Sequence, residues 1–202
     1  MLYIYGDSHA RFSFMNLSIP FYDYCQYSIT MHRIGRDNQI VNFNHEKHDW
    51  NSVVCLVYGE VDCRCHIQRQ IDLGRNENDI IDELVENYFN TIKNNVTVCK
   101  KIIIVGIIPP TKQEDYESVW GSIPDDHPYP FVGRDEERVR YTTKMNSVIQ
   151  EHCITDNYVY FDPYQYYTRE DGTFKYECSD TTVHLRDNVY FLEKFVELYN
   201  SL

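Results

Sequence analysis

Short apolar runs alternate along the chain with longer segments in which apolar residues recur every three or four positions. The runs have the length of β-strands, and the strongest is rich in β-branched residues, which suits a strand covered on both faces. Five strands are expected, at Leu2–Tyr5, Tyr27–Arg33, Ser52–Tyr58, Lys101–Ile108 and Tyr158–Phe161. This alternation predicts an α/β fold with a mostly parallel sheet.

Three amphipathic helices are expected in the longer segments. Their apolar stripes cover Asp79–Lys93, Glu136–His152 and Asp187–Asn200, and we interpret them as faces directed at the core. The segment Pro109–Gly133 holds five of the seven prolines and is expected to be a long functional loop. The segment Gln165–Cys178 is expected to form a hairpin around its Asp-Gly pair.

Composition indicates an ordinary globular protein. The chain has 202 residues, of which 43% are hydrophobic and 25% are charged, so we expect one domain over residues 1–202. A net charge of −12 argues against binding to nucleic acid or to anionic membranes. No apolar run has the roughly 20 residues of a membrane span, and the N-terminus does not resemble a secretory signal. With seven cysteines, an odd number, reduced thiols and a cytoplasmic location are predicted, and the oligomeric state stays open.

Polar and glycine-rich segments come directly after the expected strands. They are Gly6–His9, the segment around Gly35, Gly59–His66 and Ser179–His184. Because ligands of open parallel sheets bind beyond the carboxyl ends of the strands, we expect these segments to meet at one edge.

A serine, a histidine and a carboxylate among them suit nucleophilic catalysis. A serine hydroxyl needs a neighbouring base and stabilisation of the anion that forms as a carbonyl is attacked. Ser8 is the candidate nucleophile, His184 the base and Asp180 the carboxylate that orients the imidazole. Ser8 comes after a predicted strand, where the N–H groups of an opening helix point at negative charge.

These blocks resemble those of the SGNH/GDSL hydrolase superfamily. The matching positions are Gly6-Asp7-Ser8-His9 for the first block, Gly35 for the second, Gly59-Glu60-Val61-Asp62 for the third and His184 for the fifth. The resemblance implies a flavodoxin-like, three-layer α/β/α sandwich with about five parallel strands, ester hydrolysis or acyl transfer, and no cofactor. The run Gly59–His66 is similar to a subgroup with Gly-Glu-(Ile/Val)-Asp-Cys-Arg in its third block, which is associated with glycan modification.

Two positions depart from the superfamily pattern. Val61 stands where the superfamily has an asparagine that donates to the oxyanion, and loss of one such donor typically costs about 100- to 1000-fold in rate. Arg64 is the first candidate for a replacement donor, and His66 the second. Asp180 precedes His184 by four residues, whereas the superfamily spacing is three. Asp187 and Glu177 are the weaker alternatives for the orienting acid.

The sequence therefore predicts a serine-dependent esterase that acts on the O-acetyl groups of a carbohydrate, with a small molecule or a glycan ester as substrate. Alternatives are a sugar O-acyltransferase and a non-catalytic glycan-binding or assembly protein.

A structural ion pair between Arg64 and the adjacent Asp62 or Glu60 is the alternative for Arg64, and Glu60 is expected to support the loops beneath the site. No metal is predicted, because Cys63, Cys65 and His66 lack zinc-site spacing. The expected oxyanion and substrate-binding residues are Gly35, Arg64, Asp7, Gly59, Glu60, Asp62 and His66, and the expected sugar-stacking or loop-anchoring aromatics are Trp120, Tyr129 and Phe131.

Overall fold

A five-stranded parallel sheet forms the centre of the computed structural model, which describes residues 1–41, 43, 47–124 and 126–202. The strand order is β2-β1-β3-β4-β5, and each neighbouring pair is parallel. The strands are β1 (Leu2–Gly6), β2 (Phe21–Cys25), β3 (Val53–Val57), β4 (Lys101–Val105) and β5 (Val159–Phe161).

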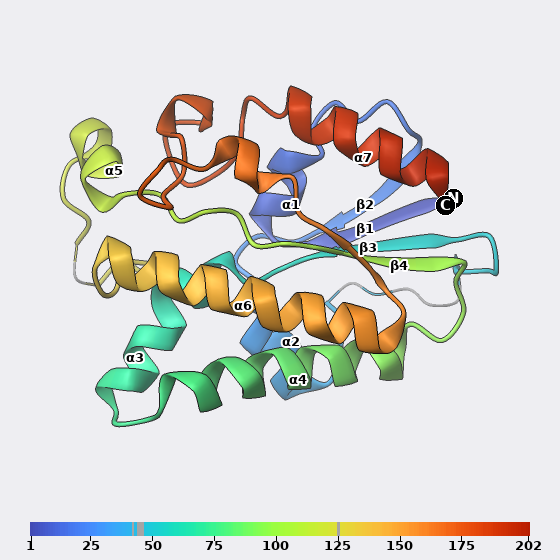
Figure 1. Cartoon of the computed structure of the whole chain (residues 1–202), viewed down its shortest axis with the longest axis horizontal. Helices are drawn as coiled ribbons and strands as arrows, with labels where there is room; N and C mark the ends of the chain where they lie inside the picture. Colours follow the sequence, from blue (N-terminus) through green and yellow to red (C-terminus); the bar gives the residue numbers. More distant parts are fainter. Residues whose placement is uncertain (42, 44–46, 125) are drawn as a thin grey trace.

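Helices cover both faces of the sheet. They are α1 (Ser8–Ser13), α2 (Met31–Asp37), α3 (Ile67–Asp72), α4 (Glu77–Asn95), α5 (Gln113–Trp120), α6 (Asp135–Asp156) and α7 (Val189–Ser201), with the short turns η2 (Asp62–His66), η3 (Tyr164–Tyr167) and η4 (Tyr176–Cys178). In Figure 1, α1 and α7 lie on one side of the sheet, and α2, α4 and α6 lie on the other. The predicted three-layer α/β/α fold is confirmed.

Two hydrophobic cores, one on each face, hold the layers together. On the first face, the stripes of α2, α4 and α6 pack on alternate residues of the strands, as Ile34, Tyr88 and Tyr141 illustrate. On the other face, Phe14, which follows the last residue of α1, meets Phe191 and Phe195 of α7 in edge-on ring contacts. Every residue of β3 is buried, as its apolar run predicts. No helix within the described ranges is long and apolar enough to cross a membrane.

The prediction for the second strand is wrong. The strand is Phe21–Cys25, and the segment expected to be extended, Tyr27–Arg33, runs into helix α2. Thr30 caps that helix, because its side chain accepts a hydrogen bond from the Arg33 N–H at 3.0 Å. β2 lies at the edge of the sheet and is partly exposed, and Asp23 interrupts its apolar residues, so it lacks the continuous buried run of β3.

The other predicted elements agree with the structure apart from their ends and the two irregular segments. Helix α5 forms inside the expected loop. Its apolar residues Tyr116, Val119 and Trp120 share one face, but none of its residues is buried. The expected hairpin is a tight turn with one antiparallel bridge, between Thr168 and Phe174, flanked by η3 and η4. Its Gly172 has a φ of +83°, which a glycine adopts without strain.

Candidate active site

Ser8 lies at the sharp turn between β1 and α1. Asp7 caps the helix, because its carboxylate accepts a hydrogen bond from the His9 N–H at 2.8 Å. The turn requires glycine at position 6, where a Cβ would lie 2.3 Å from the Ala10 Cβ and 2.8 Å from the Val57 carbonyl oxygen. The nucleophile candidate is therefore fixed by backbone geometry at the carboxyl end of a central strand.

Ser8, His184 and Asp180 form a continuous hydrogen-bonded chain. The Ser8 Oγ lies 2.9 Å from His184 Nε2, and His184 Nδ1 lies 3.0 Å from Asp180 Oδ2. Burial raises the pKa of Asp180, but hydrogen bonds from His184 and Thr182 outweigh burial and lower that pKa to about 2. The carboxylate is therefore ionised at neutral pH and faces the imidazole, as activation of a serine requires.

The extra residue between Asp180 and His184 is accommodated by a left-handed turn. Thr181 has a φ of 70°, which is costly for a β-branched residue. Its carbonyl oxygen accepts hydrogen bonds from Trp120 Nε1, at 2.7 Å, and from the Tyr176 hydroxyl. These two donors hold the turn that brings Asp180 back to the imidazole.

A cavity of about 270 Å³ opens beside the Ser8–His184 pair. Aromatic rings form much of its wall, from Tyr27, Tyr116, Tyr129 and Phe131. Tyr129 and Phe131 belong to the aromatics expected to stack on a sugar. The third, Trp120, instead donates a hydrogen bond to the Thr181 carbonyl oxygen. Sequence reasoning missed the other two rings of the wall. Tyr27 fell in the misplaced strand, and Tyr116 was not singled out although it lies in the same segment as the expected aromatics.

Arg64 also lines the cavity, and it is held on two sides. Its Nε and Nη2 bond to the Glu60 carboxylate at 2.7 and 3.1 Å, and its Nη1 donates to the Tyr129 carbonyl oxygen at 2.6 Å. Of the two carboxylates predicted as partners of Arg64, Glu60 forms the ion pair. Because a guanidinium has five N–H groups and these bonds use three, Arg64 retains two donors and a fixed positive charge beside the cavity.

A buried layer of charge supports the site. His9 lies between two carboxylates, with its Nδ1 3.3 Å from Asp7 Oδ1 and its Nε2 3.4 Å from Glu60 Oε2. Burial lowers the His9 pKa, but Glu60 and Asp7 outweigh burial, so the pKa is raised. The His9 ring centroid lies 4.8 Å from that of His184. Asp7 and Glu60, which were expected to bind substrate, lie outside the lining of the cavity. They pair with His9, and Glu60 also holds Arg64.

Gly35 lies away from this site. It is an interior residue of helix α2, where a Cβ would come within 2.7 Å of the Asn87 Cβ on α4. The glycine therefore permits close packing of two helices, and its N–H belongs to the helix ladder. The prediction that Gly35 donates to an oxyanion is wrong, because it rested on the misplaced second strand.

Ser28 contributes to the lining of the cavity that contains Ser8. It belongs to the loop after β2. The loop is tied to the Ser8 turn by a hydrogen bond from the Gln26 N–H to the Gly6 carbonyl oxygen, 2.8 Å long. No acceptor for the Ser28 N–H lies within the described part of the chain. A correctly placed second strand would have put Ser28 in the loop that follows it, at the same edge of the sheet as Ser8.

Asp62 and Gly59 hold the loop after β3 rather than lining the cavity. The buried Asp62 carboxylate accepts hydrogen bonds from the N–H groups of Met31, at 2.7 Å, and His32, at 3.1 Å. Gly59 has a φ of +119° and packs against Ile107. The prediction that these residues bind substrate is wrong, since both are covered by other elements.

Replacing Asp62 with asparagine should change how stability depends on pH. Burial raises the pKa of Asp62 to about 7, whereas an unfolded aspartate has a pKa of about 3.9. The stability contributed by the neutral carboxyl is therefore complete below about pH 4 and lost as the pH rises through about 7. From pH 5 to 7, urea unfolding should show wild type losing about 1 kcal/mol per pH unit relative to Asp62→Asn. A difference that stays constant over this range would contradict the assignment.

His66 faces a different cavity, of about 190 Å³, and its ring stacks on His32 with centroids 4.4 Å apart. The second choice for a replacement oxyanion donor is therefore wrong, because His66 lines this cavity and not the one that contains Ser8. In the described ranges, no three His, Cys, Asp or Glu side chains are grouped so that they could hold a metal ion.

Comparison with solved structures identifies the fold. A GDSL-like lipase from Bacteroides thetaiotaomicron aligns with a TM-score of 0.62 at 12% identity, over 100% of this chain and 88% of that chain. The chain has the GDSL-type fold. A member of the lipolytic G-D-S-L family from Veillonella parvula aligns with a TM-score of 0.53 at 14% identity, over 100% of this chain and 98% of that one. The OSK domain of Drosophila Oskar aligns with a TM-score of 0.57 at 12% identity, over 95% of this chain and 86% of that domain's chain. The sequence matches no protein-family model and no curated protein sequence.

Proposed function

We propose that this protein is a serine-dependent esterase of the SGNH/GDSL type. The observation that carries the proposal is the chain of hydrogen bonds from Ser8 through His184 to Asp180, with distances of 2.9 and 3.0 Å. The GDSL-type fold and the open cavity beside Ser8 support it. A complete triad also favours catalysis over a purely binding role, since binding alone needs no aligned nucleophile, base and acid.

In the proposed reaction, the Ser8 Oγ attacks the ester carbonyl carbon while His184 Nε2 takes the hydroxyl proton. The carbonyl oxygen gains the negative charge and accepts hydrogen bonds from the Ser8 and Ser28 N–H groups. Arg64 stabilises this charge in place of the asparagine that Val61 replaces. Collapse of the intermediate expels the alcohol, which takes the proton from His184. Water then attacks the acyl-serine by the same route and releases the acid.

A carbohydrate carrying O-acetyl groups is the proposed substrate. The cavity of about 270 Å³ suits a small acyl group better than a long chain. Its aromatic wall gives a sugar ring apolar faces on which to stack, while the hydroxyls of Tyr27, Tyr116 and Tyr129 offer hydrogen-bond partners. Acyl transfer to a sugar hydroxyl uses the same first half-reaction, so the ratio of transfer to hydrolysis with an added sugar acceptor separates the two outcomes.

Covalent labelling tests the nucleophile directly. A fluorophosphonate probe should label wild type at one serine, Ser8 by peptide mass spectrometry, because only an activated hydroxyl attacks it at a useful rate. Ser8→Ala should lose the label, and Ser13→Ala, on the same helix, should keep it. Absence of labelling in folded wild type, or labelling that survives in Ser8→Ala, would exclude the mechanism.

A further inference from the structure

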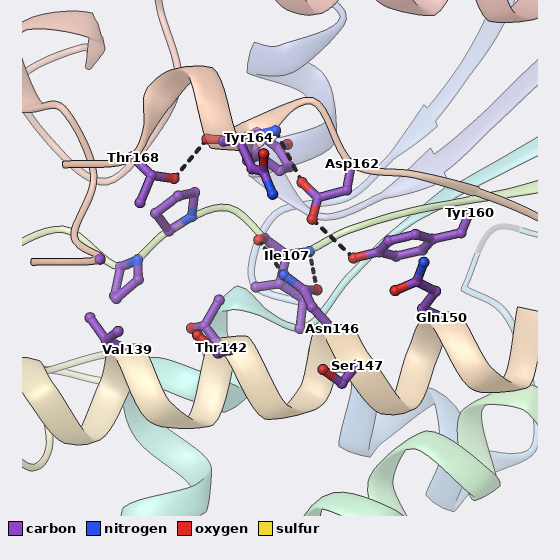
Figure 2. Close-up of a pocket in the computed structure, with 15 residues that line it drawn as sticks. Ile107, Val139, Thr142, Asn146, Ser147, Gln150, Tyr160, Asp162, Tyr164 and Thr168 are labelled. Carbon is purple, nitrogen blue, oxygen red and sulfur yellow. Dashed lines mark hydrogen bonds between the residues drawn. The ribbon is translucent and has the colours of Figure 1, made fainter. Parts of the chain in front are cut away.

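A second cavity, of about 570 Å³, lies apart from the triad. It is a groove between helix α6 and the segment that runs from β5 into η3, as Figure 2 shows. Ile107 and the two prolines after β4 form its floor. Ser8, Asp180 and His184 lie outside its lining, and its volume falls in the range of small-ligand sites, about 300–1000 Å³.

The walls of this groove are fixed by internal hydrogen bonds. The Asn146 side chain accepts from the Ile107 N–H at 2.7 Å and donates to the Ile107 carbonyl oxygen at 3.0 Å, which fastens α6 to the floor. On the opposite wall, Asp162 accepts from the Tyr164 N–H at 3.0 Å, and Thr168 donates to the Tyr164 carbonyl oxygen at 2.8 Å. Figure 2 shows these bonds on both walls. A ligand would therefore meet a preformed site and lose little affinity to ordering it.

The lining is polar but almost uncharged. Of the fifteen described residues that line the groove, only Asp162 carries a charge, although a quarter of the chain is charged. A helix face that serves only to be solvated would be expected to share the charge density of the rest of α6, which begins Asp-Glu-Glu-Arg. The absence of lysine and arginine from these fifteen residues disfavours phosphate and carboxylate ligands, and the many hydroxyls and amides disfavour lipid chains.

Several polar side chains of the groove are free to bind a ligand. Thr143, Ser147 and Gln150 of α6 and Gln165 of η3 make no side-chain hydrogen bond within the described part of the protein. Tyr160 bonds through its hydroxyl to Asp162 at 3.1 Å, and its ring lies along the groove between Asp162 and Gln150 (Figure 2). Hydroxyls and amides both donate and accept, as each sugar hydroxyl does, and an aromatic ring suits the apolar face of a pyranose.

We propose that this groove is a binding site for a neutral sugar chain, formed by the polar face of α6 and the β5–η3 segment. The site is separate from the catalytic cavity, and its binding does not depend on ester chemistry. A glycan held here would be retained by the protein whether or not its ester groups reach Ser8.

The test measures binding in the Ser8→Ala protein, so that no reaction interferes. Neutral tetrasaccharides of glucose (α1,4 and β1,4), xylose and N-acetylglucosamine are titrated against ¹⁵N-labelled protein. We expect at least one to shift the amide signals of Ser147, Gln150 and Gln165 together, with a Kd in the millimolar range or tighter. Ser147→Trp, which fills the groove from an exposed helix position, should weaken that binding at least tenfold.

The matched control is Glu151→Trp, which adds the same bulk to the same helix outside the groove lining and should bind as Ser8→Ala does. Circular dichroism confirms that both variants fold. The proposal is overturned if none of the tetrasaccharides shifts the groove signals, if Ser147→Trp and Glu151→Trp bind equally, or if a neutral Ser/Gln-rich peptide binds the groove more tightly than every sugar. Loss of esterase activity alone would leave the proposal standing, because the assay uses a protein without the nucleophile.

Discussion

Replacing His184 with alanine should lower kcat for p-nitrophenyl acetate hydrolysis by about 10⁴- to 10⁶-fold. His184 is the base nearest the nucleophile, with Nε2 2.9 Å from the Ser8 Oγ. Without it, the serine proton has no acceptor, and the leaving alcohol has no donor. Ser8→Ala should lose a similar amount, and the double variant should lose little more, because the two side chains act as a unit.

The comparison needs a histidine variant that leaves the site intact. His152→Ala removes an imidazole from α6, where the ring contacts Phe89 in the core on the α2–α4–α6 face, and should keep kcat within about threefold of wild type. Both variants are checked for folding by thermal unfolding. If folded His184→Ala retained more than a tenth of the wild-type rate, His184 could not be the general base.

Asp180→Asn should lower kcat by about 10⁴-fold. An amide in place of the carboxylate no longer stabilises the imidazolium and favours the wrong tautomer of His184. Because His184 and Thr182 lower the pKa of Asp180 to about 2, its carboxylate is ionised at every pH above about 3. The defect should therefore be of similar size from pH 6 to pH 9, which a kcat profile of both proteins would show.

Two other acids near the end of the chain serve as matched controls. Asp187→Asn and Glu177→Gln alter the weaker candidates for the orienting carboxylate, and each should keep kcat within about threefold of wild type. The His184 Nδ1 is 3.0 Å from Asp180, and neither control residue is hydrogen-bonded to this ring. A large loss in either control, with Asp180→Asn unaffected, would move the role of the acid to that residue.

The triad and the sheet were accessible from sequence for a common physical reason. Buried strands such as β3 and β4 leave continuous apolar runs, and the carboxyl ends of parallel strands bring their connecting loops to one edge of the sheet. Ser8 and the Ser179–His184 segment could thus be assigned to one site although they are far apart in the chain. The extra residue before His184 left Asp180 as the weakest assignment, and only coordinates reveal the left-handed Thr181 that compensates for it.

Other predictions failed where the sequence has no distinctive pattern of apolar and polar residues. The edge strand β2 is partly exposed and Asp23 interrupts its apolar residues, so it lacks the continuous buried run of β3, and the misplaced second strand led to the assignment of Gly35 as a donor. The third block raised a different difficulty. From the sequence, Glu60 and Asp62 are equally suited to binding substrate and to holding the loop in place. Burial distinguishes them: Glu60 holds Arg64, and Asp62 caps α2. Spacing alone carries no information about which side a carboxylate faces.

Helix α5 has no buried residue, yet its last residue holds the turn that positions Asp180. The Trp120 indole supplies one of two donors to the carbonyl oxygen of Thr181, whose φ is left-handed, so a shift of α5 would also loosen the proposed orienting carboxylate, Asp180. The same helix contributes Tyr116 to the cavity wall. Substitutions that remodel this wall to admit a new substrate would thus tend to change turnover as well as affinity, which couples the evolution of selectivity to that of rate.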